Sequence, residues 1–244
     1  MYPSVNLIGI VTLIIILAFG LALRRKAYDP VKRIVDLTLS LAAIVAFSPI
    51  MLVAALAIKL DSKGPIFHFA DRVGAKRRRI KVWKLRTMVA DADRYGNITG
   101  ANDSRITRVG SFLRATKIDE LPQLINVVLG TMSIVGPRPE SAAIVERYYT
   151  EEDNELFDVP PGLTCPGTLY YYIHYDDHEL PVGMSTDEFY VRNSLRPKLA
   201  ADLHYVRHRR LSYDFKLIFL TVVIILVQLF GTKLNWLPDI MRPR

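Results

Sequence analysis

The sequence predicts an α+β membrane protein, in which apolar helices attach a small, mainly helical cytoplasmic domain with a short β-hairpin to the bilayer. Long uncharged stretches lie within the first quarter of the chain and near residue 220, and basic residues flank them. Between these stretches, alternating runs typical of strands mix with helical patterns. Lys and Arg outnumber Asp and Glu by 32 to 24, and the resulting formal charge of +8 favours anionic partners such as lipid headgroups, nucleotides or nucleic acid.

Residues 1–26 contain the first predicted membrane helix. Residues 6–23 carry no charge, and at about 1.5 Å per residue they nearly cross a hydrocarbon core of about 30 Å. A secretory signal would have basic residues before this stretch and a small-residue cleavage site after it, and neither is present. Because Arg24, Arg25 and Lys26 follow the stretch, the positive-inside rule places them in the cytoplasm. We therefore predict a retained transmembrane helix.

Residues 27–60 hold a second apolar stretch, which the residues alone allow in two arrangements. A spanning helix is the simpler one, because Ile34 to Ile58 is long enough to cross. However, basic residues lie at both ends of the stretch, and both clusters favour the cytoplasm. Ser48-Pro49 lies in the middle, where proline removes a helix hydrogen bond and serine can satisfy a freed backbone group. A helix that enters, bends at Ser48-Pro49 and leaves on the same side is the alternative.

Residues 61–211 form the predicted cytoplasmic domain. Two short strands, at 66–69 and 80–85, should form a hairpin around a basic turn. We expect helices at 118–129, 138–149 and 186–210, a loop at 159–167 and an extended aromatic run at 169–175. There is no glycine-rich dinucleotide or P-loop signature. The single cysteine, Cys165, excludes an internal disulfide, which fits a reducing compartment.

Residues 212–244 contain a third uncharged stretch, at 217–230, which is short for a span. Basic residues flank it on both sides. We therefore expect an interfacial or packed helix there.

Two adjacent carboxylates, Asp119 and Glu120, begin the predicted helix at 118–129. Neighbours on a helix point about 100° apart, so the two acids would not share a face. At a helix start both lie at the positive end of the helix dipole, and Pro122 is tolerated in the first turn. The simpler interpretation is thus structural, with Asp119 as an N-cap. The alternative is chemical, since an ionised Asp can attack phosphorus and Mg²⁺ binds carboxylates together with phosphate oxygens.

Basic residues that could bind phosphate surround this pair in the sequence. Lys84 and Arg86 are two positions apart on a predicted strand and would project to one side. Arg114 precedes the acids, and Arg138 lies between two prolines in a rigid turn suited to a fixed guanidinium fork. Solvated surface or lipid contact is the alternative for each. Arg105 and Arg108 could instead pair with Asp103, and the histidines show no metal-binding spacing.

These motifs occur in an order that resembles the bacterial sugar transferase family, the monotopic polyprenyl-phosphate phosphoglycosyl transferases. Each motif is weak alone, and the ordered set is specific. The set consists of Lys32-Arg33 with Asp36, Ser48-Pro49, Lys59 with Gly64-Pro65, Arg72-Val73-Gly74, Lys84-Leu85-Arg86-Thr87-Met88, Arg105-Ile106-Thr107-Arg108, Leu113-Arg114, Asp119-Glu120-Leu121-Pro122-Gln123-Leu124, Gly136-Pro137-Arg138-Pro139 and Pro161-Gly162-Leu163-Thr164.

The resemblance implies an enzyme that moves a sugar-1-phosphate from a nucleotide diphosphate sugar to a membrane polyprenyl phosphate and releases a nucleoside monophosphate. The implied partners are a UDP-sugar, undecaprenyl phosphate and anionic membrane lipid, and no nucleic acid. Such enzymes initiate a glycan (exopolysaccharide, capsule, O-antigen or glycoprotein) at the cytoplasmic face of the bacterial inner membrane. The resemblance also favours the re-entrant helix bent at Ser48-Pro49.

The resemblance further implies roles for single residues. Asp119 would be the nucleophile that forms a covalent aspartyl-phosphosugar. Glu120 would help Asp119 bind Mg²⁺ or would assist proton movement. The cations that would surround the phosphates are Lys84, Arg86, Arg114 and Arg138.

Several positions depart from the family pattern. Lys117 replaces a serine, Thr131 replaces an aspartate, and the segments 165–168 and 170–172 differ from the usual ones. The last two segments are expected near the donor, so the donor sugar is the least transferable property. A non-catalytic basic membrane scaffold that binds anionic lipid or nucleic acid would explain the charge and the apolar stretches, but not the ordered motifs.

Overall fold

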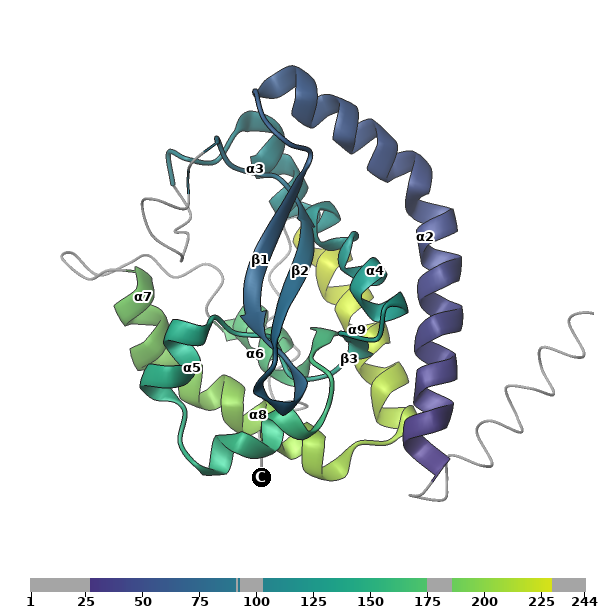
Figure 1. Ribbon diagram of the computed structural model, residues 1–244, viewed down its shortest axis with the longest axis vertical. Helices are drawn as coiled ribbons and strands as arrows, with labels where there is room; N and C mark the ends of the chain where they lie inside the picture. The colour runs from purple at the N-terminus through teal and green to yellow at the C-terminus, as the bar shows by residue number, and fades with distance from the viewer. Residues whose placement is uncertain (1–26, 91, 93–102, 175–185, 230–244) are drawn as a thin grey trace, which may run out of the picture.

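The computed structural model describes residues 27–90, 92, 103–174 and 186–229. Helices surround two small sheets, and the first described helix runs along one edge of the molecule (Figure 1). The predicted transmembrane helix within residues 1–26 and the tail from residue 230 lie outside the described residues. The mainly helical domain with a small β-hairpin is confirmed.

Helix α2 (Tyr28–Asp61) is a single 34-residue helix with Pro49 in its interior. Figure 1 shows it running along the edge and then bending across the end of the molecule. Proline explains such a bend because it removes a backbone hydrogen bond and clashes with the preceding turn. The Ser48 hydroxyl donates to the carbonyl of Val45 at 2.8 Å. The break predicted at Ser48-Pro49 is therefore an interior proline in a continuous bent helix, and re-entry stays a prediction.

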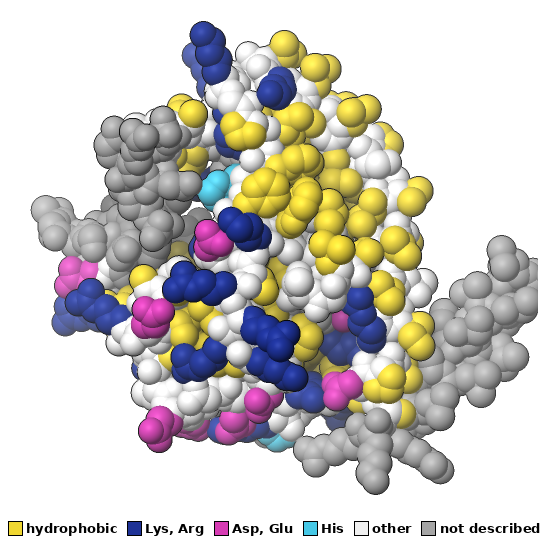
Figure 2. Space-filling model, in the orientation of Figure 1, with side chains coloured by type: hydrophobic (Ala, Val, Ile, Leu, Met, Phe, Trp, Pro, Cys, Tyr) yellow, Lys and Arg dark blue, Asp and Glu magenta, His cyan; other side chains and the backbone are white. Residues whose placement is uncertain are grey.

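Most of the outward surface of α2 is apolar and exposed. Val45, Leu52 and Leu60 are 74%, 73% and 81% exposed, and apolar atoms cover the side of the molecule on which α2 lies (Figure 2). Two described helices, α2 and α9 (Leu211–Leu229), are long and apolar enough to cross a membrane. Because water would penalise this much apolar surface, α2 is suited to contact with lipid.

Strands β1 (Phe67–Val73) and β2 (Arg79–Leu85) pair antiparallel, which confirms the predicted hairpin. Phe69 is the register partner of Trp83, and their rings meet edge to face at 4.8 Å between centroids. Lys76 and Arg77 turn the chain with positive φ. Alternation along the strands buries Ala70 and Val82 on the opposite face.

A second sheet was missed by the sequence prediction, which placed a loop at 159–167. Strands β3 (Ser133–Val135) and β4 (Gly162–Thr164) pair in parallel. Each has only three residues, too few to display an alternating pattern. The pairing continues into the turn after β3, where Gly136 N–H donates to Thr164 O at 3.1 Å and Gly162 N–H donates to Pro137 O at 2.9 Å.

The remaining helices agree with the prediction in part. The extended run predicted at 169–175 is wrong, because Pro166–His174 is helix α6 and buries Leu169 completely. The helix predicted from residue 138 begins only at Ala142, where the Ser141 side chain caps it. The described helices that follow β2 are α3 (Arg108–Ala115), α4 (Gln123–Val128), α5 (Ala142–Tyr148), α6, α7 (Thr186–Phe189), a π-helical segment (Tyr190–Leu195), α8 (Arg196–His208) and α9.

The main core lies between α4, β3, α6, α8 and α9. Helix α9 inserts Leu217 and Ile224 into this core, and both are fully buried. On its other face Phe219 is 67% exposed. The stretch predicted as an interfacial or packed helix is thus packed on one side and apolar and exposed on the other.

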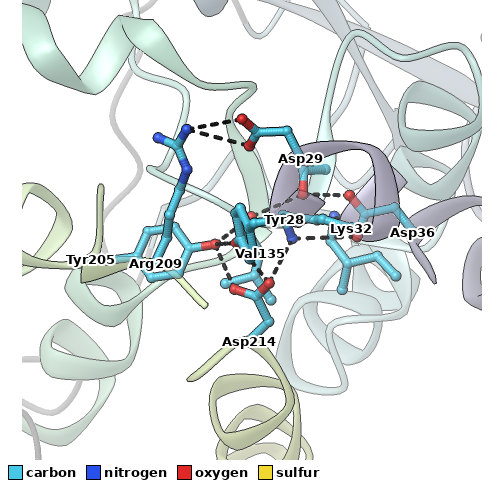
Figure 3. A network of polar contacts seen from close by, with 10 residues as sticks. Tyr28, Asp29, Lys32, Asp36, Val135, Tyr205, Arg209 and Asp214 are labelled. Carbon is cyan, nitrogen blue, oxygen red and sulfur yellow. Dashed lines mark hydrogen bonds and ion pairs between the residues drawn. The ribbon is translucent and has the colours of Figure 1, made fainter. Parts of the chain in front are cut away.

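A buried polar network joins the start of α2 to the C-terminal helices (Figure 3). Asp214 of α9 accepts from Tyr28 at 2.8 Å and from Tyr205 of α8 at 2.6 Å. Lys32 lies between Asp214, at 3.3 Å, and Asp36, at 3.5 Å. Such groups are costly to bury unless they are paired, so the network holds α2 in one position on the domain.

The close approach of α3 to the segment after β2 predicts a stability effect. A Cβ at Gly110 would lie 2.0 Å from the carbonyl oxygen of Thr87, a backbone atom that cannot move freely. Gly110→Ala should therefore lower the free energy of unfolding by about 1–3 kcal/mol, measured as a lower melting temperature in detergent.

Gly74→Ala is the matched control. Its Cβ would meet only the Ile80 side chain, at 3.0 Å, which can rotate away. Equal melting temperatures for the two variants would contradict the packing described here.

Candidate functional site

Asp119 lies in a short 3-10 turn and not at the start of a long helix. Lys117 takes a left-handed conformation, with φ of 57°, and turns the chain away from α3. Residues Ile118–Glu120 then form the 3-10 turn, and α4 starts at Gln123. The predicted capping role of Asp119 is therefore wrong: the residue before α4 is Pro122, and no side chain caps that helix. The single helix predicted at 118–129 is two elements because the left-handed Lys117 and Pro122 reset the backbone.

Glu120 binds two cationic side chains, which come from two segments distant in the sequence. Its Oε1 accepts from Lys84 Nζ, on β2, at 2.8 Å and from Arg138, in the turn after β3, at 3.2 Å. Burial opposes the charged form of Glu120, but Lys84 and Arg138 outweigh it and hold the pKa of Glu120 well below its usual value. Glu120 is therefore an ionised centre that fixes both cations.

Asp119 differs from its neighbour because its carboxylate has no partner within the part of the chain that the structure describes. It is 7% exposed, and no hydrogen bond or ion pair to it occurs among the described residues. Burial, followed by the negative charge of Glu120, raises the pKa of Asp119 to about 6. The nearby charges of Lys84, Arg114 and Lys117 act in the opposite direction. At neutral pH Asp119 is thus mostly ionised, unpaired and available to a ligand.

The structure brings Arg114 to the site and places Arg86 elsewhere. Arg114 donates through Nε to Thr87 Oγ1 at 2.8 Å, and its charge acts on Asp119. The Arg86 guanidinium instead donates to the carbonyls of Lys63 and Ser62 at the end of α2. β2 ends at Leu85, so the strand alternation that would place Arg86 beside Lys84 no longer applies. Arg86 is therefore a structural anchor for the end of α2.

Comparison with known proteins decides the family. A sequence model described as "Bacterial sugar transferase" matches residues 27–228 of the 244. The chain belongs to the bacterial sugar transferase family.

Three curated relatives of this family member illustrate the similarity. A UDP-glucose:undecaprenyl-phosphate glucose-1-phosphate transferase from Escherichia coli is 37% identical over 194 residues, which cover 78% of this chain and 39% of the relative. A UDP-N-acetylgalactosamine-undecaprenyl-phosphate N-acetylgalactosaminephosphotransferase from Aeromonas hydrophila is 32% identical over 217 residues, 88% of this chain and 48% of the relative. A UDP-glucose:undecaprenyl-phosphate glucose-1-phosphate transferase from Caulobacter vibrioides is 37% identical over 226 residues, 88% of this chain and 77% of the relative. The chain thus spans less than half the length of the first two.

Several residues that border the site were not among the candidate site residues predicted from the sequence. Lys117 places its ammonium 4.3 Å from the centroid of the Tyr172 ring, on α6. Behind Arg138 lies a cluster of the partly buried Glu140 and the buried Lys198 and Asp202. Lys198 and Glu140 are 58 positions apart, so no spacing rule links them. The observable signal was a lysine and an aspartate four positions apart on one helix, which the sequence prediction did not use.

Asp119 and Glu120 form a donor set that fits a magnesium ion bound together with a phosphate ligand. No group of three or more His, Cys, Asp and Glu side chains that could hold a metal occurs within residues 27–90, 92, 103–174 and 186–229. Mg²⁺ does not need such a cage, since it is usually held by one or two carboxylates, substrate phosphates and water. The unpaired Asp119 carboxylate and the second oxygen of Glu120 are the groups that remain for it.

Proposed function

We propose that this chain transfers a sugar-1-phosphate from a UDP-sugar to undecaprenyl phosphate and releases UMP. The observation that carries the proposal is the buried, ionisable Asp119, which is unpaired among the described residues and lies beside a Glu120 that already holds two cations. An aspartate used only to stabilise the fold would be paired with a donor. The family and the names of the three relatives support the reaction class.

In the first step, an Asp119 carboxylate oxygen attacks the phosphorus that bears the sugar. The P–O bond to the UMP phosphate breaks, and its electron pair leaves with UMP. Lys84, Arg114 and Arg138 lie where they can offset the charge on the diphosphate and on the leaving group. The product is an acyl phosphate between Asp119 and the sugar phosphate.

In the second step, a phosphate oxygen of undecaprenyl phosphate attacks the same phosphorus. The bond to Asp119 breaks, the carboxylate is regenerated, and the lipid diphosphate sugar leaves. The covalent step lets two bulky anions use one small site in turn. A magnesium ion bound by Asp119 and Glu120 would supply further charge compensation at the phosphates.

We also propose that the site faces the cytoplasm at the bacterial inner membrane, with α2 re-entering on that side. The interior Pro49 of α2 and its exposed apolar surface support this arrangement. Both ends of α2 carry basic residues, which favours the cytoplasmic side for both.

Single cysteines at the two ends of α2 test this topology. In a Cys165→Ser background, Asp29→Cys and Lys59→Cys should both react with an impermeant maleimide in inside-out vesicles and not in right-side-out vesicles. If α2 spans the membrane, the maleimide would label one of the two cysteines in inside-out vesicles and the other in right-side-out vesicles. That result would contradict re-entry.

Replacing the proposed nucleophile gives the sharpest test of the reaction. Asp119→Asn keeps the side-chain shape and removes the attacking charge, so UMP release should fall by at least about 10³-fold. The assay contains Mg²⁺, undecaprenyl phosphate, and UDP-glucose or UDP-N-acetylgalactosamine. The matched control is Asp71→Asn, on the exposed hairpin surface, which should retain full activity. A folded Asp119→Asn protein with parent-like UMP release would refute the assignment.

The raised pKa of Asp119 predicts a pH profile for the first step. Single-turnover UMP release without undecaprenyl phosphate, at low donor concentration, should be level above pH 6 and fall about tenfold per unit below it. An aspartate at its ordinary pKa of 3.8 would hold the rate down to about pH 4. Undecaprenyl phosphate is left out because it is a phosphate monoester, which also titrates near pH 6 and would add a second pH dependence to the measured rate.

Glu120→Gln is the diagnostic variant for this profile. It removes the adjacent negative charge, so the pKa of Asp119 falls and the acid limb moves to lower pH. An unchanged limb in this variant would mean that another group sets it.

A further inference from the structure

Helix α8 buries two opposite charges one helical turn apart, outside the reacting groups. Lys198 and Asp202 are 5% and 3% exposed. Burying charges is unfavourable unless each is paired and hydrogen-bonded, so their partners indicate what the burial achieves.

The partners of Asp202 include two backbone N–H groups from different segments, in addition to the Cys165 thiol. Oδ2 accepts from Arg138 N–H at 3.3 Å, and Oδ1 accepts from Gly167 N–H at 2.8 Å. Pro137 and Pro139 have no N–H, so Arg138 carries the single backbone donor of that three-residue stretch. Gly167 permits the close approach, because a Cβ there would lie 2.7 Å from the carbonyl oxygen of Lys198.

Lys198 holds the same turn on the other side of Pro139. Its ammonium donates to Glu140 Oε1 at 3.1 Å, and the Tyr190 hydroxyl donates to the same oxygen at 2.5 Å. The turn is therefore tied to α8 at two points, the Arg138 N–H and the Glu140 side chain.

The two segments held by Asp202 are two walls of the site. Arg138 reaches Glu120 from the turn. Helix α6, which begins beside Gly167, carries the Tyr172 ring that faces Lys117. Asp202 itself has no contact with Asp119 or Glu120 among the described residues.

We propose that Asp202 is a positioning residue that sets the Arg138 turn and the start of α6, so that the diphosphate of the UDP-sugar binds in the geometry needed for attack. This inference rests on the proposed function. Asp202 acts through Arg138, since a guanidinium on an untethered turn would have to be ordered by the substrate at each binding event. Loss of the Asp202 hydrogen bonds should therefore weaken binding of the UDP-sugar more than it slows the reaction of the UDP-sugar once it is bound.

A double-mutant cycle tests the inference. Asp202→Asn should lower kcat/KM for the active UDP-sugar about tenfold, mainly through a higher KM. In an Arg138→Ala background, the same change should alter kcat/KM by less than about twofold, because the residue through which it acts is gone. If the Asn variant does not fold, Asp202→Glu replaces it in the same double-mutant cycle, because this change keeps the charge but moves the carboxylate.

Asp153→Asn is the matched control. Asp153 is also buried, accepts from the Thr150 N–H at 2.7 Å and pairs with Arg196 of α8 at 2.8 Å. It should lower the melting temperature without changing KM.

The outcomes separate the two proposals. Equal losses for Asp202→Asn in the parent and in the Arg138→Ala background, or a KM unchanged in a folded Asp202→Asn protein, would overturn the positioning role while the parent still releases UMP. A parent protein that releases no UMP from either donor would overturn the proposed function, and this inference with it.

Discussion

The arrangement of the site depends on one carboxylate oxygen, Oε1 of Glu120, which binds both Lys84 and Arg138. Glu120 satisfies these cations, and the adjacent Asp119 has no hydrogen-bond or ion-pair partner among the described residues. Burial, followed by the negative charge of Glu120, raises the pKa of Asp119 to about 6. Two neighbouring acids in one turn therefore have different tasks, and the difference comes from their surroundings and not from their chemical type. The left-handed Lys117 separates the 3-10 turn that carries both acids from the end of α3.

The cations reach Glu120 because sheet pairing fixes the segments that carry them. Lys84 lies on β2, whose pairing with β1 is regular along seven residues. Arg138 follows β3, whose parallel pairing with β4 continues into the prolyl turn. The second sheet is small, but it brings residues 133–138 beside 162–164 and so joins the segment after α4 to the segment before α6. Buried charges on α8 complete the support of the turn.

The sequence predicted the parts of the fold that rest on local patterns and missed those that rest on distant contacts. The hairpin, the long apolar helix with Pro49 and the acidic pair with its cations all follow from short motifs. Helix α6 was missed because its aromatic residues favour strands by propensity, while packing against α8 made them helical. The sequence did not predict that the Arg86 guanidinium binds carbonyls at the end of α2, because strand alternation stops one residue before it. The role of Asp202 depends on a contact across 64 positions, which no pattern in a single sequence reports.

The tyrosine–aspartate network at the start of α2 has a consequence for how the protein is made. Tyr28 is synthesised early and its partner Asp214 is 186 residues later, near the end of the described chain. During translation α2 is therefore complete long before the groups that hold it in place have been synthesised. Until then Lys32 can pair with Asp36 but not with Asp214. The domain closes onto α2 only after α8 and α9 have left the ribosome. A chain that stalled before α9 would thus contain a complete α2 without the groups that hold it on the domain.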